Sequence, residues 1–318
     1  MRRLSAAFAT LLLLAATGAL AQGGARRLVV AAAPGSPLDG TARLFAAQLS
    51  KELGKSVVVD NPGGANGWAA AEQVAKSSAD GTVMLLAGAG VLAIDPGLHA
   101  GLAYDPRRDF TPVSRVASNP MVLVVNPASQ AWSAAELVVM TRDAKLPVPI
   151  ATSGTGSISH LTYLLFLDSA KTRFTRVPYS SAALAISDVA NGQVTAYWGG
   201  LPELIGPMRR GLLNPIGVAA GRRHPLMPDV RTLAEQRLPG VAASDWTALL
   251  VPAATPPSAV GALNRAARAA LQAKALRAGL RRAGVEPSPS TPGELANLMR
   301  SDAAAWAALI RAKNVKAE

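Results

Sequence analysis

The fold of this chain is decided by the stretch LVVAAAPGSPLDGTARLFAAQLSKELGKSVVVD, which covers residues 28–60. The short apolar run 28–32 predicts a β-strand, and 56–60 predicts a second one. Between them, apolar residues recur at 42, 45, 46, 49 and 53, which is the spacing of one helical face, and Gly54 follows as a C-cap. A strand, a helix over 41–53 and a second strand form a βαβ unit, which implies parallel strands.

The same alternation continues through both halves of the chain. In the first half, 68–77 predicts a helix and 82–86 a third strand. In the second half, three short strands alternate with two helices, over 150–152, 160–170, 175–177, 182–190 and 193–198. Alternating strands and helices predict an α/β fold with a largely parallel sheet. We therefore expect two α/β halves of similar design.

Two further extended runs predict strands that cross between the halves. Residues 121–125 and 246–251 are apolar, and each ends at a turn that contains proline. If both cross, one domain comprises residues 22–122 plus 246–318 and the other comprises 123–245. The C-terminal segment is predicted to be helical, because Thr291 to Glu294 forms a capping box with proline at the first helical position. Paired domains of this kind imply a cleft between them, where ligands bind.

The N-terminus carries the pattern of a secretory signal peptide. Arg2 and Arg3 precede a short apolar run over 11–16, and Ala19-Leu20-Ala21 supplies the small residues of a cleavage site. We expect a signal peptide over residues 1–21, with cleavage after Ala21 and export to the periplasm. The alternative is a membrane anchor, which requires about 20 mostly apolar residues. The chain contains no cysteine, so disulfides, cysteine nucleophiles and an N-terminal lipid on cysteine are excluded.

The chain is basic, with a formal net charge of +12 that falls to +10 without Arg2 and Arg3. Nucleic acid is not an expected partner, because the arginines are scattered and no aromatic residues alternate with them. Two explanations stay open: a solvated basic surface without a dedicated partner, or an electrostatic field that attracts anionic ligands toward a cleft.

The loop after the first strand, residues 34–40, precedes a helix directly. Unpaired N–H groups and the positive end of the helix dipole make a helix N-terminus a favourable place for a carboxylate. The alternative interpretation is an ordinary strand–helix turn in which Asp39 or Thr41 is the N-cap.

The loop over residues 152–160 has the same position in the second half. It is rich in hydroxyl groups, and Gly154 and Gly156 permit close approach of the backbone to a ligand. It matches neither a dinucleotide-binding fingerprint nor a P-loop, because a third glycine and a lysine are missing. The alternative is a glycine turn in which Ser157 or Ser159 caps the next helix.

No arrangement of residues in the sequence predicts an enzyme, a cofactor or a metal site. His160 follows Ser157 closely, but a third group that would orient this pair is not evident. The three histidines are far apart and lack metal-ligand spacing. Asp39, Asp60 and Asp245 could meet in a cleft, yet nothing in the sequence pairs two of them as an acid and a base.

Seven segments together resemble the Bug family, the periplasmic solute-binding proteins of tripartite tricarboxylate transporters. They are APGSPLDGTARLFA (33–46), VVVDNPGGANGWAAAEQVAKSSADG (57–81), YDPRRDFTPVSRVASNPMVLVVNP (104–127), ATSGTGSISHL (151–161), VPYSSAALAISDVANGQV (177–194), LMPDVRTLAEQRLPG (226–240) and TALLVPAATP (247–256). The resemblance covers residues 27–315.

The resemblance implies a type II periplasmic-binding-protein fold, in which two α/β domains are joined by crossover strands with a cleft between them. It implies a small carboxylate as ligand (a di- or tricarboxylate, an acidic amino acid or an aromatic acid), permease subunits as partners, and a monomer. Matched by position, the implied ligand-binding residues are Gly35, Ser36, Pro37, Leu38, Asp39, Ala89, Ser153, Thr155, Ser157, His160, Tyr179 and Gly199.

The chain departs from the family pattern in the first loop. Ser36 and Pro37 stand where the family usually has a second glycine and the residue after it, and Pro37 removes one backbone donor. Glycines 199 and 200 stand where a polar side chain is common. Two other functions stay open at this point: a ligand-sensing partner of a signalling receptor, and an enzyme or scavenger with an altered site.

Overall fold

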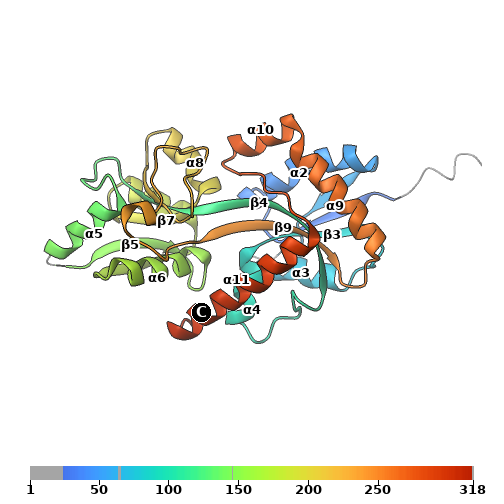
Figure 1. The fold of residues 1–318 in the computed structure, drawn as a ribbon, viewed down its shortest axis with the longest axis horizontal. Helices are drawn as coiled ribbons and strands as arrows, with labels where there is room; N and C mark the ends of the chain where they lie inside the picture. Colours follow the sequence, from blue (N-terminus) through green and yellow to red (C-terminus); the bar gives the residue numbers. More distant parts are fainter. Residues whose placement is uncertain (1–23, 64–65, 145, 317–318) are drawn as a thin grey trace, which may run out of the picture.

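The computed structural model describes residues 24–63, 66–144 and 146–316. The expected signal peptide, residues 1–21, lies outside this range. Two lobes lie side by side, joined by the long strands β4 and β9 (Figure 1). The expectation of an α/β fold with two halves and a connecting pair of strands is confirmed.

The first lobe is built from the start and the end of the chain. Its N-terminal elements are β1 (Arg26–Val30), α2 (Pro37–Leu53), β2 (Val57–Asp60), α3 (Trp68–Ala75), β3 (Val83–Gly88), the π-helical turn η1 (Gly90–Ile94) and α4 (Asp95–Leu98). Its C-terminal elements are α9 (Pro257–Gln272), α10 (Lys274–Arg282) and α11 (Pro292–Ala312).

The second lobe is built from the middle of the chain. Its elements are α5 (Ala134–Asp143), β5 (Val148–Ser153), α6 (Ile158–Ala170), β6 (Phe174–Tyr179), α7 (Ala182–Ala190), β7 (Ala196–Gly200), α8 (Leu201–Arg209), β8 (Asn214–Val218) and the 3-10 turn η2 (Ala234–Gln236). Strands β4 (Phe110–Val125) and β9 (Ser244–Pro252) belong to both lobes.

One sheet runs through both lobes in the order β2-β1-β3-β9-β4-β7-β5-β6, and β8 also pairs with β4. The outer strands of each lobe are parallel, as the sequence predicts, whereas β9 and β4 are antiparallel to each other and to β3 and β7. The partner of β4 changes within the strand: Pro120 pairs with Ser244 of β9, and Met121 pairs with Gly200 of β7. We propose that the chain crosses between the lobes here.

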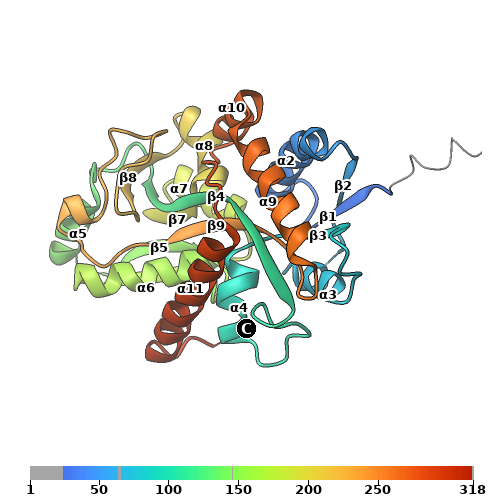
Figure 2. The ribbon, with the colours of Figure 1, turned by 45° about the vertical axis from the view of Figure 1, so that its right-hand side comes forward.

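Helices cover both faces of the sheet in the first lobe. Helices α2 and α9 lie side by side on one face, where Phe45 and Leu49 of α2 pack with Leu263 of α9. On the other face, residues of α3, η1 and α11 share one core with Trp246 of β9, and α11 lies beside α4 (Figure 2). Within the described part of the chain, no helix is long and apolar enough to cross a membrane.

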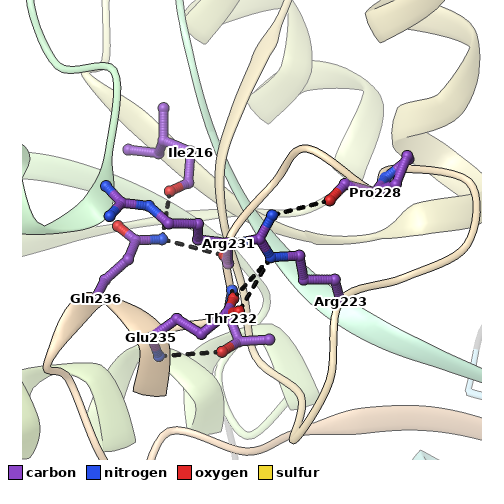
Figure 3. Close-up of polar contacts among 7 residues, drawn as sticks. All are labelled: Ile216, Arg223, Pro228, Arg231, Thr232, Glu235 and Gln236. Atoms are coloured by element: carbon purple, nitrogen blue, oxygen red, sulfur yellow. Dashed lines mark hydrogen bonds and ion pairs between the residues drawn. The ribbon is translucent and has the colours of Figure 1, made fainter.

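A hydrogen-bonded segment without a long helix or strand connects β8 to β9 (Figure 3). Gln236 is buried, and its amide nitrogen donates to the carbonyl oxygens of Ile216 (2.9 Å) and Arg231 (3.1 Å). The Arg223 guanidinium lies 3.0 Å from Glu235. In this segment, the Gln236 side chain thus satisfies backbone carbonyl groups that would be paired between strands in a regular sheet.

The structure differs from the sequence prediction chiefly in β4 and in α2. Only residues 121–125 of β4 were expected, because prolines at 112 and 120 and irregular pairing interrupt the pattern of its first part. Helix α2 begins at Pro37 rather than at Thr41, because the Ser36 side chain is its N-cap. Thr41 instead donates back to the carbonyl oxygen of Pro37 at 2.9 Å.

Candidate functional site

A cleft with two adjoining cavities lies where the lobes meet. The first cavity has a volume of about 240 Å³, and residues of both lobes line it, among them Ser36, Leu38, Ser153, Ile158, Glu203 and Asp245. The second has a volume of about 500 Å³, and its lining includes Trp68, Asp95, His99, Thr155, Gly156 and Ser157. Leu38, Gly88, Ile158 and Asp245 line both cavities, so we treat the two as one cleft.

The start of α2 forms one wall of the cleft, and its loop is held by its own side chains. Ser36 Oγ accepts a hydrogen bond from Asp39 N at 3.2 Å, and Asp39 Oδ2 accepts from Gly35 N at 2.9 Å and from Arg43 Nε at 3.0 Å. Burial raises the pKa of Asp39, but the Arg43 and Gly35 hydrogen bonds outweigh it and hold that pKa below its usual value. Asp39 therefore stabilises the loop and does not line either cavity.

The start of α6 forms the opposite wall. Ser157 Oγ caps this helix by accepting from His160 N at 3.2 Å, and it donates to the Ser153 carbonyl oxygen at 3.2 Å. His160 is buried, and its Nδ1 accepts from Gly156 N at 3.1 Å. His160 thus shapes the loop from behind, and it lines neither cavity.

The two helix starts converge on the same space. Leu38 is the second residue of α2 and Ile158 is the first residue of α6, and both line both cavities. Their backbone N–H groups belong to the first helical turn, which has no carbonyl partner within its own helix. Two positive helix ends, one from each lobe, therefore face the cleft, an arrangement that favours an anion.

Gly156 allows the second lobe to approach the first closely. Its φ is +80°, and a Cβ atom there would lie 2.5 Å from Leu98 Cδ1 of α4. Any larger residue would be strained in its backbone and would press on the Leu98 side chain. The loop over 154–157 is thereby held against the first lobe at the edge of the cleft.

Two carboxyl groups share the first cavity. Glu203 Oε1 accepts from Tyr197 Oη at 2.8 Å and from Gly200 N at 2.9 Å. Burial raises the pKa of Glu203 to about 7 against these hydrogen bonds, and the nearby Asp245 carboxylate raises it further. Burial also raises the pKa of Asp245 to about 6, although the Ala89 N–H stabilises its ionised form. These are the acidic groups of the cleft with the most strongly raised pKa values.

Several of the residues that the family pattern implied lie on the cavity walls. Ser36, Pro37, Leu38 and Ser153 line the first cavity. Thr155 and Ser157 line the second, and Thr155 Oγ1 accepts from Arg176 at 3.0 Å.

Other implied residues lie behind the walls. Gly35 is outside both linings and donates to Asp39, while Ala89 supports Asp245. Tyr179 donates to Asp188 at 2.6 Å, away from the cleft. Gly199 packs under the Tyr197 ring, where a Cβ atom would lie 2.5 Å from Cε1.

Glu203 was not predicted from the sequence as a site residue, and Asp245 was considered without a partner. Glu203 follows Gly200-Leu201-Pro202, a helix start with proline and an acidic residue in the first turn, which could have been recognised. Asp60, the third carboxyl considered, is instead paired with Arg27 on the outside of the first lobe. Across the described residues, no group of three or more His, Asp or Glu side chains is arranged to hold a metal ion.

Comparison with known proteins identifies close relatives over nearly the whole chain. Residues 41–315 match the family model described as tripartite tricarboxylate transporter family receptor. Protein BugT of Bordetella pertussis is 31% identical over 91% of this chain and 89% of its own length.

Two solved structures extend this likeness to the fold. R. palustris Rpa4515 with adipate has a TM-score of 0.81 and 31% identity, covering 92% of this chain and 98% of that one. MatC from Rhodopseudomonas palustris with bound malate has a TM-score of 0.76 and 30% identity, covering 90% and 98%.

Proposed function

Because the chain belongs to the family of tripartite tricarboxylate transporter receptors, we propose that it captures a small carboxylate in the cleft and delivers it to a transporter of that type. The observation that carries this proposal is the convergence of the α2 and α6 starts at Leu38 and Ile158. The relatives solved with adipate and with malate support a carboxylate as the ligand class.

The backbone supplies the grip on the carboxylate. Pro37 occupies the first position of α2, where its missing N–H would have no helical partner in any case, so the next donor toward the cleft is Leu38 N. On α6, Ser157 caps His160 N, which leaves the N–H groups of Ile158 and Ser159 as donors. Each hydrogen bond to a charged group contributes about 1.5–3 kcal/mol.

Capture requires that the lobes move about the crossing strands. Contacts from both lobes meet in one cleft, so a ligand that touches both walls stabilises the closed arrangement. We place the hinge at the two short segments where β4 and β9 pass between the lobes, residues 118–120 and 244–245.

The same proposal assigns no covalent chemistry to the site. Ser153 Oγ lies 3.1 Å from Tyr197 Oη, and Ser159 Oγ donates to the Trp198 carbonyl oxygen, so neither hydroxyl faces a general base. We propose that the protein works in the periplasm, in keeping with the N-terminal charge and apolar pattern, and that it is a monomer, as the family resemblance implies.

The substitution Ile158→Pro tests the backbone grip. Proline is tolerated at the first helical position, and Ser157 already has the extended conformation (φ −62°, ψ 161°) that precedes proline. The variant therefore loses one N–H donor with little other change. We expect affinity for the best carboxylate to fall at least tenfold.

Residues 22–318 are first screened by thermal shift against mono-, di- and tricarboxylates and amino acids, and the best binder is then titrated calorimetrically. Ile158→Ala is the matched control, since it removes the side chain and keeps the N–H. If Ile158→Pro binds as tightly as Ile158→Ala, the carboxylate is not held at α6.

A further inference from the structure

The cleft is acidic although the protein is basic. Its linings contain the carboxyl groups of Glu203, Asp245 and Asp95 together with His99, and no lysine or arginine among the described residues. The chain as a whole carries a formal net charge of +12. No lysine or arginine side chain of a described residue is part of these linings, and Arg176 reaches the edge of the second cavity only through Thr155, so a ligand in the first cavity meets mainly negative charge.

The acidic groups stand next to the proposed carboxylate grip. Asp245 lines both cavities, as Leu38 and Ile158 do, and Glu203 lines the first. One small ligand in a first cavity of about 240 Å³ must therefore lie near both the helix starts and the two carboxyls. Its two ends would meet opposite electrostatic environments.

The partners of these carboxyls within the protein do not neutralise them. Glu203 receives two neutral hydrogen bonds, from Tyr197 Oη and Gly200 N, and Asp245 receives one from the Ala89 backbone. Among the described residues, neither takes part in a salt bridge. Both carboxyls are half-buried, and a half-buried carboxylate without a cationic partner is costly, so a ligand that brings the cation removes that cost.

We propose that the ligand is a zwitterion with one carboxylate and one protonated amine, the carboxylate on the starts of α2 and α6 and the amine beside Asp245 and Glu203. This inference rests on the proposed function, because it assumes that the cleft binds a carboxylate. A dicarboxylate would bring its second negative charge to two carboxyl groups that repel it.

The groups around Asp245 and Glu203 predict opposite pH dependence for the two ligand classes. Tyr197 on β7 donates to Glu203, the Ala89 N–H after β3 donates to Asp245, and Asp95 and His99 line the second cavity together with Asp245. Arg176 reaches the rim of that cavity through Thr155. The pKa is about 6 for Asp245 and about 7 for Glu203, so both carboxyls take up a proton as the pH is lowered from 8 to 5. Their protonation weakens the binding of an amine and reduces the repulsion of a diacid.

The experiment compares ligands of matched length. Calorimetric titrations of residues 22–318 at pH 8 and pH 5 use 3-aminopropanoate with malonate, 4-aminobutanoate with succinate, and 5-aminopentanoate with glutarate. The α-amino acids alanine and 2-aminobutanoate are paired with propanoate and butanoate. In at least one pair we expect the amino compound to bind at least tenfold more tightly at pH 8, with that preference reduced at pH 5. Equal or tighter binding of the partner acid in every pair overturns the inference.

Variants assign the preference to the two carboxyls. Asp245→Asn and Glu203→Gln are expected to lower affinity for the amino compound at least tenfold each while leaving diacid affinity unchanged or raised. Asp60→Asn, at an ion pair outside the cleft, is the matched control and should change neither. If the cleft variants keep the amine preference of the wild type, the inference is wrong. If one variant folds poorly, the other decides by itself.

The outcomes separate this inference from the proposed function. If diacids bind, depend on Ile158 N–H and are preferred at every pH, the carboxylate site stands and the amine site falls. If no carboxylate of either class binds, the proposed function itself fails and this inference with it.

Discussion

At the scale of single residues, the cleft shows how neighbours decide what a carboxyl group does. Asp39 is buried, but it lies beside Arg43 and a backbone N–H, so its pKa is lowered and it stabilises its own loop. Asp245 and Glu203 are half-buried and form no ion pair with a described residue, so burial raises their pKa values. The same kind of side chain is structural in one place and a candidate ligand contact in the other.

The raised pKa values predict that ionised Asp245 destabilises the ligand-free protein. The pKa of Asp245 rises from its ordinary 3.8 to about 6 on folding, so the folded state binds this proton more tightly than the unfolded state. The resulting cost is absent below pH about 4, grows between pH about 4 and about 6, and stays constant above that range. Because the group borders an open cleft, we expect Asp245→Asn to raise the free energy of unfolding by about 1–2 kcal/mol at pH 8.

Urea unfolding of wild type and variant at pH 8 and pH 4 measures this difference. At pH 4 the two proteins should differ little, because the wild-type carboxyl is then protonated in the folded state. A variant less stable than wild type at pH 8 would show that ionised Asp245 has a favourable partner.

At the scale of elements, the site depends on how two helices begin. Ser36 and Ser157 are the N-caps of α2 and α6, and each accepts from the third residue of its helix. Each cap satisfies one N–H and leaves the earlier donors directed to the cleft. Side chains of the two loops thus fix the helix starts, and in the proposed binding mode the backbone contacts the ligand.

The substitution Ser157→Ala tests whether the N-cap of α6 matters for ligand binding and not only for the stability of the helix. We expect a loss of about 1 kcal/mol in unfolding free energy and a several-fold loss in carboxylate affinity, because the first turn of α6 frays. Ser133→Ala is the matched control: Ser133 caps α5, outside the cleft, with a similar hydrogen bond of 3.1 Å to Glu136 N. Thermal melting and calorimetric titration should show similar destabilisation for both variants and weaker binding for Ser157→Ala alone.

At the scale of the whole molecule, β4 and β9 make one sheet out of two lobes (Figure 1). Other links are side-chain contacts at the edges, such as the ion pair of Lys313 with Asp168 and the hydrogen bond from Arg209 to the Arg282 carbonyl oxygen at 2.7 Å. Such exposed contacts are weak and can break during a hinge motion.

The absence of cysteine makes this motion directly measurable. Cysteines introduced at Lys51 on α2 and at Leu184 on α7 would be the protein's sole labelling sites, and both positions are exposed. We expect the distance distribution between two spin labels there to shift and narrow when a saturating carboxylate is added. A distribution that stays the same with bound ligand would show that the lobes do not move.

The sequence by itself determined the two-lobed α/β plan, the crossing strands and the two loops that reach the cleft. These features follow from local periodicity, capping residues and glycine turns, all of which depend on residues that are close together in the sequence. Residues 110–120 of β4 escaped prediction because Pro112 and Pro120 interrupt the local strand pattern, and only the irregular pairing with the distant strand β9 makes them part of the sheet.

Only the tertiary structure decided which predicted residues line the cleft and which support it. The side chains of Asp39 and His160 accept hydrogen bonds from backbone N–H groups of their own loops and therefore point away from the cleft. Glu203 and Asp245 come together because β9 returns across the lobes beside the sheet that leads into α8. The charge that a ligand meets depends on such long-range placement and on burial, and neither is encoded in the spacing of residues along the chain.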